Sequence, residues 1–202
     1  MLTKEEALQI MERSFGKKGE LKKLHSDRDQ NFLFLSKGKK YLLKIFNSIE
    51  NPQIIDMQIA SIKHILNSDF PFMVPEPVKD VKSISSDGKN YFVCLFKYIE
   101  GKFLHESKLK ENQYKNMGIL MGSLTKVLTK FEYSAGIRTF EWDLQDINLV
   151  YERVKYVKEK ESKKVLYHFL ENYKNKVCPI IGSLRKSIIH NDGNDHNIIL
   201  HT

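Results

Sequence analysis

Residues 187–200 read SIIHNDGNDHNIIL, a stretch in which two apolar runs enclose eight residues that are polar or glycine. Burying so many polar groups costs free energy unless they find partners, so such a cluster has little reason to form unless its groups bind something. The alternative is an Asn/Asp-rich turn that joins two strands, which is a common structure. Turn chemistry alone, however, does not require His190, Asp192 and Asn197 at these spacings.

The spacing inside this stretch indicates phosphoryl-transfer chemistry. Asp192 and Asn197 stand five residues apart. Kinase catalytic loops have the same spacing, and there the Asp accepts the proton of the substrate hydroxyl while the Asn binds a magnesium ion. His190, two residues before the Asp, would orient the loop. His196 is expected to be structural or exposed, because no HExxH pattern supports a zinc site.

The first half of the chain predicts a small antiparallel sheet with a helix packed on it, which is an α+β arrangement. An amphipathic helix opens the chain, with Thr3 and Glu6 spaced as a capping box. A second helix is expected from Pro52, with Asn51 as its N-cap. Four β-like runs predict two hairpins, 31–35 with 41–46 and 78–84 with 91–96.

The character of the sequence changes after Gly101, where helical periodicity replaces β-like alternation. Apolar residues mark a long helix that reaches Phe131, and two more helices are expected at 149–158 and 165–173. We therefore predict an N-terminal lobe over residues 1–98 and a largely helical lobe over residues 99–202, with a hinge between them.

Several motifs resemble one family, in the expected order along most of the chain. The string HNDGNDHNIIL is similar to the HGDxxxxNIL loop of aminoglycoside phosphotransferase-like kinases, and its NDHN core is particularly similar to hydroxylysine kinases and to related bacterial kinase domains fused to class III aminotransferases. One departure is Asn191, where the family usually has Gly, so the backbone there is expected to differ slightly. The other motifs that resemble this subgroup are SDRDQNF at 26–32, YLLKIFN at 41–47, IIDMQ and IASIKHIL at 54–66, and FEWDL at 140–144.

Lys44 is the candidate phosphate-binding residue of the first lobe. It shares one face of its strand with Leu42 and Phe46, where a lysine is poorly placed for water. In a kinase such a lysine binds the α and β phosphates of the nucleotide, and a polar residue of the following helix, usually Glu, orients it. Counted against the family pattern, that position falls on Gln58, whose neutral side chain would leave the charge of the lysine uncompensated. The alternative is a lysine that snorkels from a strand edge.

The resemblance implies a protein-kinase-like fold of two lobes that ends after the catalytic loop, and transfer of the γ-phosphoryl group of ATP or GTP to a hydroxyl of a small amine or amino acid, with hydroxylysine as the first expectation. It implies that the turn 26–31 covers the phosphates. The hinge residues Phe96, Tyr98 and Ile99 would recognise the purine edge. Mg²⁺ would be bound by Asn197 and by a second Asp beyond Thr202, so we expect these 202 residues alone to show no appreciable kinase activity.

Composition excludes several other classes of protein. The chain is 41% hydrophobic and 29% charged, which favours a folded protein over a disordered one. No apolar run approaches the roughly 18 residues of a membrane-spanning helix, so no membrane association is expected. Two cysteines are too few for a disulfide framework, so a cytoplasmic, reducing location is expected. The net charge of +8 raises the question of nucleic acid. Its densest runs, 17–23 and 155–164, interleave lysine with glutamate as solvated helix faces do, so no nucleic-acid partner is expected.

Two rival functions stay open at this level. One is a nucleotide-binding pseudokinase or regulatory module, which the neutral Gln58 and the unusual Asn191 favour. The other is a basic nucleic-acid-binding domain, which only the net charge favours. Fusion to or association with further domains is also compatible with the sequence.

Overall fold

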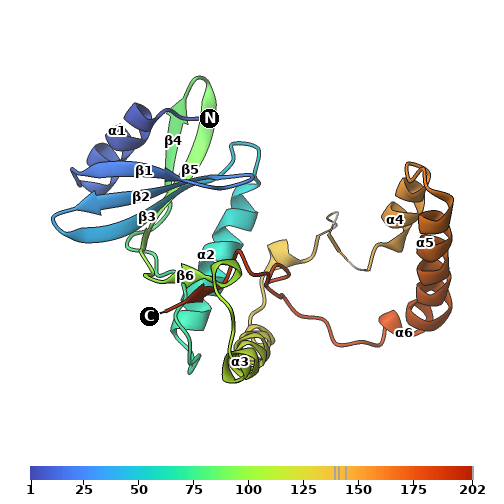
Figure 1. Ribbon diagram of the computed structural model, residues 1–202. Coiled ribbons are helices and arrows are strands. Elements are labelled where there is room, and N and C mark those ends of the chain that lie inside the picture. Colours follow the sequence, from blue (N-terminus) through green and yellow to red (C-terminus); the bar gives the residue numbers. More distant parts are fainter. Residues whose placement is uncertain (139, 141, 144, 202) are drawn as a thin grey trace. The chain divides into compact units, whose positions relative to one another are not determined.

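The computed structural model describes residues 1–138, 140, 142–143 and 145–201. The chain divides into two units, one made of Met1–Ala135 with Ile188–Thr202 and the other of Gly136–Ser187 (Figure 1). The first unit therefore contains both the expected sheet and the HNDGNDHNIIL stretch. The lobe boundary predicted at residue 98 lies inside this unit, and the division into two lobes at that residue stays a prediction.

A five-stranded antiparallel sheet forms the first part of this unit, with the strand order β1-β2-β3-β5-β4. Both predicted hairpins are present, β2 with β3 and β4 with β5. Each turns through two residues with positive φ, Lys37-Gly38 and Asp87-Gly88, whose twist matches that of the flanking strands. The strands are β1 (Glu20–Leu24), β2 (Gln30–Ser36), β3 (Lys39–Ile45), β4 (Lys82–Ser86) and β5 (Lys89–Lys97).

The fourth strand is shorter than its sequence pattern suggested. We expected a strand over 78–84, but β4 begins at Lys82. Pro77 forms a separate bridge with Phe96, and the Val78 N–H donates to the Leu95 carbonyl at 2.7 Å. The residues between this bridge and β4 do not pair regularly with β5. The single strand predicted over 78–84 is therefore replaced by two short pairings, both with β5.

Residues 17–23 are not a helix face, and this prediction was wrong. Helix α1 (Lys4–Phe15) ends because Gly16 adopts the left-handed conformation, with φ 64°. The chain then forms β1, an edge strand paired with β2. Leu21 is buried while the lysines beside it are exposed. Charged side chains along an edge strand discourage pairing with other chains, so solvation was predicted correctly and the type of element was not.

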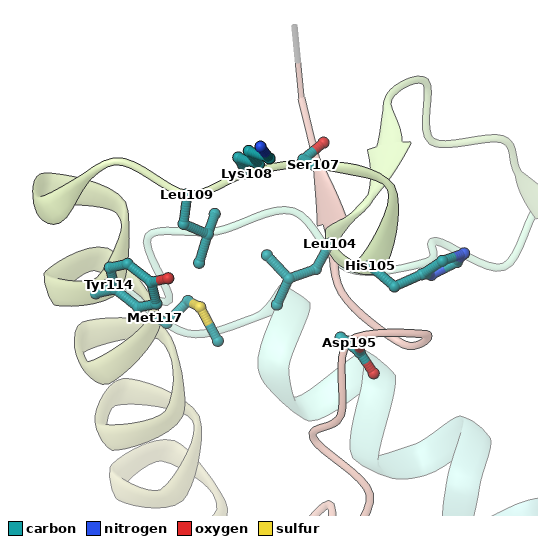
Figure 2. A pocket seen from close by; sticks show the side chains of 8 residues that line it. All are labelled: Leu104, His105, Ser107, Lys108, Leu109, Tyr114, Met117 and Asp195. Atoms are coloured by element: carbon teal, nitrogen blue, oxygen red, sulfur yellow. The ribbon is translucent and has the colours of Figure 1, made fainter.

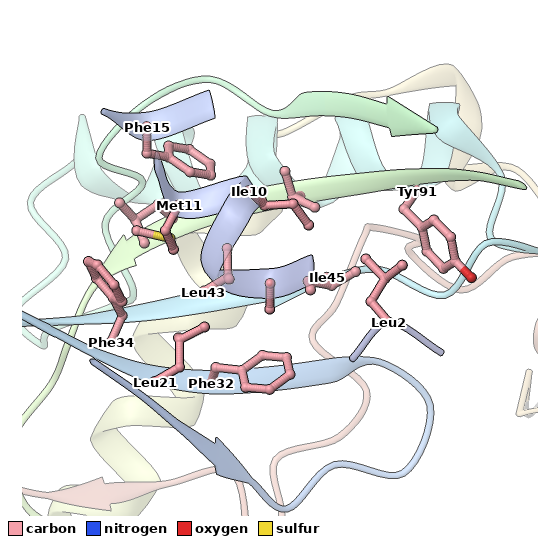
Figure 3. Close-up of a cluster of buried hydrophobic side chains, with 13 residues drawn as sticks. Leu2, Ile10, Met11, Phe15, Leu21, Phe32, Phe34, Leu43, Ile45 and Tyr91 are labelled. Atoms are coloured by element: carbon pink, nitrogen blue, oxygen red, sulfur yellow. The ribbon is translucent and has the colours of Figure 1, made fainter. Parts of the chain in front are cut away.

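Two helices cover opposite faces of the sheet (Figure 1). Helix α1 begins with the expected capping box of Thr3 and Glu6. Helix α2 (Pro52–Leu66) begins with the expected N-cap, in which the Asn51 side chain accepts from the Gln53 N–H at 2.9 Å. Figure 3 shows the larger buried cluster, in which alternate residues of the sheet meet α1. The strand residues of that cluster are Leu21, Phe32, Phe34, Leu43, Ile45, Tyr91, Val93 and Leu95.

The second cluster lies under α2 and contains Phe46, Cys94 and Phe96 from the sheet segments. Alternate residues of one strand therefore enter different cores, because side chains of successive strand residues point to opposite faces. This alternation places Lys44 on the α2 side, as its sequence neighbours predicted.

A short antiparallel pair returns the end of the chain to the first unit. Strand β6 (Lys102–Phe103) pairs with β7 (Ile199–Leu200). A 3-10 turn, η1 (Leu104–Glu106), and helix α3 (Glu111–Leu128) follow β6. Helix α3 ends three residues before the predicted Phe131. It meets α2 through His64, whose Nε2 lies 3.1 Å from the carbonyl oxygen of Val127.

The second unit is helical, as the sequence predicted, but its helices have other bounds than the expected 149–158 and 165–173. It contains α4 (Ile147–Val154), α5 (Lys160–Asn172), a π-helical turn, η3 (Tyr173–Val177), and α6 (Cys178–Ile181). The Tyr151 hydroxyl on α4 donates to Glu171 on α5 at 2.8 Å. A 3-10 turn, η2 (Ser134–Gly136), stands where the two units meet in sequence. In the described part of the chain, no helix has both the length and the apolar character needed to cross a bilayer.

Candidate active site

Lys44 stands in the middle strand of the sheet, opposite Asn31 on β2 and Cys94 on β5. Its Nζ lies 2.7 Å from Oδ2 of Asp29, and 27% and 20% of these two side chains are exposed. The ammonium group also lies 5.0 Å from the ring centroid of Phe46. This lysine is therefore a partly buried cation with an acidic partner, which differs from a lysine that extends freely into water.

Gln58 is the residue of the following helix that sequence counting paired with Lys44. The residue is half-buried on α2, and its carbonyl accepts a hydrogen bond from Ser61 Oγ at 2.8 Å. Within the described residues, its side chain makes no hydrogen bond with Lys44. The expectation that the charge of Lys44 would be uncompensated is wrong, because Asp29 supplies the carboxylate. Counting along the chain assumed a partner from the following helix, whereas the partner precedes β2. A role of Gln58 in nucleotide binding stays a prediction.

The turn before β2 is tied to the segment that leaves β3. Asp29 Oδ1 accepts from the Asn47 N–H at 3.0 Å, and Asn47 Nδ2 donates to the Arg28 carbonyl at 3.3 Å. Arg28 also lies 3.8 Å from a carboxylate oxygen of Glu50. These contacts fix the turn that the family resemblance assigns to the nucleotide phosphates, so Asp29 is anchored at both of its carboxylate oxygens.

Asn31 adds an unsatisfied polar atom next to this ion pair. Its side chain shares a face of the sheet with Lys44, because directly opposed residues of antiparallel strands point the same way. Among the described residues, Asn31 Oδ1 is the buried side-chain oxygen or nitrogen that has no hydrogen-bond partner. A buried acceptor without a donor is rare in folded proteins, so this position has the capacity for one more hydrogen bond.

The HNDGNDHNIIL stretch forms a loop in which two asparagine side chains donate hydrogen bonds to the Asp192 carboxylate. Asn194 Nδ2 donates to Asp192 Oδ1 at 2.6 Å, and Asn197 Nδ2 donates to Asp192 Oδ2 at 2.7 Å and to its backbone carbonyl at 3.0 Å. The structure thus brings together the two residues that the spacing singled out. The amide nitrogen of Asn197 is committed to Asp192, and Oδ1 is the atom of that amide left to face a ligand.

His190 and Asn191 shape the entry into this loop. The Asp192 N–H lies 3.3 Å from His190 Nδ1, which accepts the hydrogen bond, so His190 contacts the residue it was expected to orient. Asn191 has a φ of 62°, in the left-handed region that glycine adopts most readily. Asparagine is the side chain that tolerates this region best after glycine, which explains how it can stand where the family usually has Gly.

The loop is joined to β6 and η1 through its own backbone. The Leu104 N–H donates to the Ile198 carbonyl at 2.9 Å, and the His105 N–H donates to the Asp195 carbonyl at 3.2 Å. The rings of His105 and His196 stack with 4.1 Å between centroids. His196 is therefore an exposed, structural residue, as expected.

The predicted hinge residues follow one another at the end of β5, but their surroundings differ. Phe96 is buried in the cluster under α2, while Tyr98 and Ile99 are half-buried. Lys40 Nζ lies 2.7 Å from Glu100, which joins the hinge to β3. Recognition of a purine edge by these residues stays a prediction.

A pocket of about 640 Å³ opens between the segment that follows β6 and helix α3 (Figure 2). The HNDGNDHNIIL loop contributes Asp195 to its lining, whereas Asp192 and Asn197 do not line it. The pocket therefore lies beside the candidate catalytic residues. Its other lining residues are Leu104, His105, Ser107, Lys108, Leu109, Tyr114 and Met117.

The FEWDL match is only partly described by the structure. Glu141 and Leu144 lie outside the described residues, while Trp142 is exposed.

Cys94 lies on the sheet face that carries Lys44, and burial raises the pKa of its thiol to about 12. This thiol is neutral at physiological pH and is therefore no nucleophile there.

The oxygen donors of the loop fit a magnesium ion that is shared with a nucleotide. Mg²⁺ takes oxygen ligands and is commonly bound by one or two protein side chains together with substrate phosphates and water. Asn197 Oδ1 is such an oxygen ligand, because the hydrogen bonds of this amide to Asp192 use its nitrogen. In the described residues, no group of three or more His, Cys, Asp or Glu side chains is placed to hold a metal ion by itself.

Comparison with known proteins gives a consistent family. A family model described as the phosphotransferase enzyme family matches residues 20–202. Hydroxylysine kinase of Mus musculus is 27% identical in an alignment 222 positions long, which covers 99% of this chain and 59% of the relative. Hydroxylysine kinase of Xenopus laevis is 26% identical, with coverages of 98% and 59%. The chain thus spans about three fifths of the length of these relatives.

Solved structures show the same fold at low sequence identity. Spectinomycin phosphotransferase, solved with ADP and spectinomycin, matches 98% of this chain and 65% of its own with a TM-score of 0.58 and 10% identity. A Ralstonia eutropha protein classed among the aminoglycoside phosphotransferases matches 100% and 61% with a TM-score of 0.63 and 13% identity. A microcompartment-associated aminopropanol kinase matches 67% and 45% with a TM-score of 0.53 and 17% identity.

Proposed function

The chain belongs to the phosphotransferase enzyme family, and from that premise we propose that it carries the nucleotide-binding and catalytic-loop residues of a small-molecule kinase. The reaction is transfer of the γ-phosphoryl group of ATP or GTP to a hydroxyl of a small amine or amino acid. The observation that carries the proposal is the loop in which Asn197 and Asn194 both donate to the Asp192 carboxylate. These two hydrogen bonds hold the carboxylate in one orientation, in which it can accept a hydrogen bond from the hydroxyl of one substrate.

In the proposed mechanism, Asp192 accepts a hydrogen bond from the substrate hydroxyl and takes its proton as that oxygen attacks the γ-phosphorus. The bond from the γ-phosphorus to the bridging β–γ oxygen breaks, and the nucleoside diphosphate leaves with that oxygen. Phosphoryl transfer depends mainly on positioning and electrostatic stabilisation, so the residues that hold Asp192 matter as much as its basicity. His190 supports the loop by accepting the Asp192 N–H. Lys44 contributes a positive charge to the α and β phosphates.

Magnesium supplies charge neutralisation of the phosphates when it is bound with the nucleotide. Asn197 would hold it through Oδ1, the atom that its hydrogen bonds to Asp192 leave available. The choice between ATP and GTP would depend on the backbone of Tyr98 and Ile99, which follow β5.

Hydroxylysine is the first substrate to test, and the similarity to the hydroxylysine kinases supports this choice. The structural likenesses support the fold alone, so homoserine, choline, fructosamine and aminoglycosides belong in the same panel. A cytoplasmic location, without a nucleic-acid or membrane partner, is part of the proposal because ATP and small amine substrates are available there.

The proposal is tested in two stages. Binding of a fluorescent ATP analogue to the chain is measured with and without Mg²⁺, and transfer of labelled γ-phosphate to each hydroxyl compound is then measured with the complete protein. We expect saturable binding of the analogue and Mg²⁺-dependent labelling of one compound class. Nucleotide binding without transfer to any compound would instead support a pseudokinase. Steeply salt-dependent binding to nucleic acid, with no nucleotide binding, would support the basic-domain alternative.

A further inference from the structure

The ion pair between Asp29 and Lys44 joins two segments to which the proposed function gives different tasks. Asp29 belongs to the turn assigned to the nucleotide phosphates, and Lys44 belongs to the strand that presents the phosphate-binding cation. Their charged atoms lie 2.7 Å apart, and about three quarters of each side chain is shielded from water. A charge pair in such a partly buried place is screened less than an exposed one, so it restricts where the ammonium group can lie.

Asp29 is itself held from a second side. Its Oδ1 accepts the Asn47 N–H at 3.0 Å while its Oδ2 faces Lys44. The carboxylate therefore bridges the end of the turn and the exit of β3. An ammonium group has three N–H donors, and Asp29 accepts from one of them. The other two N–H groups of Lys44 can therefore face phosphate oxygens.

We propose that Asp29 is the positioning residue of Lys44 and performs the task that a helix glutamate performs in other kinases. This inference rests on the proposed kinase function. Because Asp29 is anchored to Asn47, it stays beside Lys44 when nucleotide is bound and directs the lysine toward the phosphates. The turn that covers the phosphates and the lysine that binds them are thereby coupled through one side chain.

The rival role for Asp29 is a competitor that occupies Lys44 until nucleotide displaces it. The two roles predict opposite effects of Asp29→Asn, which preserves the size of the side chain and its capacity to accept from Asn47. For a positioning residue, turnover falls by about 10- to 100-fold because the lysine is misplaced, while nucleotide affinity changes by less than about threefold. For a competitor, nucleotide affinity rises and turnover is retained.

A double-mutant cycle with Lys44→Met separates this role from a merely structural one. In the Lys44→Met background, Asp29→Asn should change turnover by less than about twofold, because the residue it acts through is gone. The same cycle is followed by thermal unfolding of the chain without nucleotide. Asp29→Asn should lower the melting temperature of the wild type but raise that of Lys44→Met, where it removes a shielded carboxylate that has lost its partner.

The matched control is the Lys63–Asp80 pair, which has a similar distance of 2.9 Å but 53% and 83% exposed side chains. Lys63→Met and Asp80→Asn should act additively and leave turnover unchanged. Additive effects of the Asp29 and Lys44 substitutions in an active protein would overturn the inference, as would tighter nucleotide binding by Asp29→Asn. A wild-type protein that neither binds nucleotide nor transfers phosphate would instead overturn the proposed function itself, while the unfolding cycle would still report whether the pair is coupled.

Discussion

Lys44 and Asp192 belong to the same unit but are held in place by different means. Lys44 lies on a central strand whose neighbouring residues Leu43 and Ile45 are buried in the larger core. Asp192 lies on an exposed loop that is held by its own side-chain hydrogen bonds and by the short pairing of β6 with β7. The position of the proposed nucleotide-side residue therefore depends on the core, whereas the position of the proposed catalytic carboxylate depends on local contacts that can be altered without unfolding the sheet.

The largest effect is expected for Asp192→Ala, which removes the proposed base from the loop. Turnover of the complete protein should fall by about 10²- to 10⁴-fold, the usual contribution of a positioned general base. Nucleotide affinity should stay within a few-fold, because Asp192 acts on the acceptor hydroxyl, and the melting temperature should hardly change because the residue is exposed. Steady-state kinetics together with nucleotide titration check this, and near-normal turnover would remove Asp192 from the catalytic role.

Thiol alkylation compares Cys94, which is buried on the sheet, with Cys178, which is exposed. The pKa of Cys94 is raised by burial to about 12 from an ordinary 9.0. The thiolate fraction at pH 8 is therefore about a thousandfold lower than for an ordinary cysteine, and the thiolate becomes a major form only as the pH approaches 12. Cys178 is exposed. Iodoacetamide labelling followed by mass spectrometry should modify Cys178 first and Cys94 only on unfolding. Equal labelling rates would show that the sheet face is open.

The core side of the comparison is tested directly by Phe34→Ala. This side chain is fully buried between the sheet and α1 (Figure 3). Its removal should lower the free energy of unfolding by about 3–5 kcal/mol through lost burial and the cavity it leaves. The neighbouring Leu35→Ala is the control, since that residue is 37% exposed and faces the other way. Denaturant titration measures both, and equal losses would contradict the assignment of the two faces.

Gly101→Ala is expected to displace the catalytic loop more than it destabilises the protein. Gly101 has a φ of 149°, and an added Cβ would come within 2.3 Å of the Leu200 carbonyl oxygen. The pairing of β6 with β7 must then shift. Hydrogen exchange should report weaker protection of the Leu104 N–H, and turnover should fall by at least about tenfold because Asp192 moves. The control is Gly122→Ala in α3, where an added Cβ meets nothing within 4 Å and helix propensity favours alanine. Unchanged protection at Leu104 would contradict the role of the pairing.

The smallest effects are expected at Asn191, whose φ is 62°. Asn191→Gly should leave turnover near normal and change the unfolding free energy by less than about 1 kcal/mol, because glycine adopts this conformation without a steric cost. Asn191→Val should cost about 1–2 kcal/mol, since a β-branched residue is strained there. Thermal unfolding of the two variants measures the difference. A valine variant as stable as the glycine variant would show that the loop has another backbone conformation available.

Local patterns in the sequence predicted a large part of the fold. The alternation around Lys44 correctly placed it opposite the larger core, because side-chain direction in a strand depends only on position along the strand. The N-cap at Asn51 and the capping box of Thr3 and Glu6 were predicted for the same reason, since each is complete within a few consecutive residues. The spacing of Asp192 and Asn197 belongs to this group as well, because one loop contains both residues and their hydrogen bond.

Tertiary structure alone decided the contacts between segments that are distant along the chain. The sequence assigned the partner of Lys44 to Gln58, whereas the structure gives Asp29, which the strand pairing of β2 with β3 brings alongside. The sequence pattern also predicted a helix face for residues 17–23, because the apolar alternation in β1 is short and rich in charged residues. Only the pairing with β2 makes this segment a strand. The pairing of β6 with β7, which positions the loop, joins residues almost a hundred positions apart. Such pairings depend on the free energy of the whole assembled sheet and loop, which no local periodicity records.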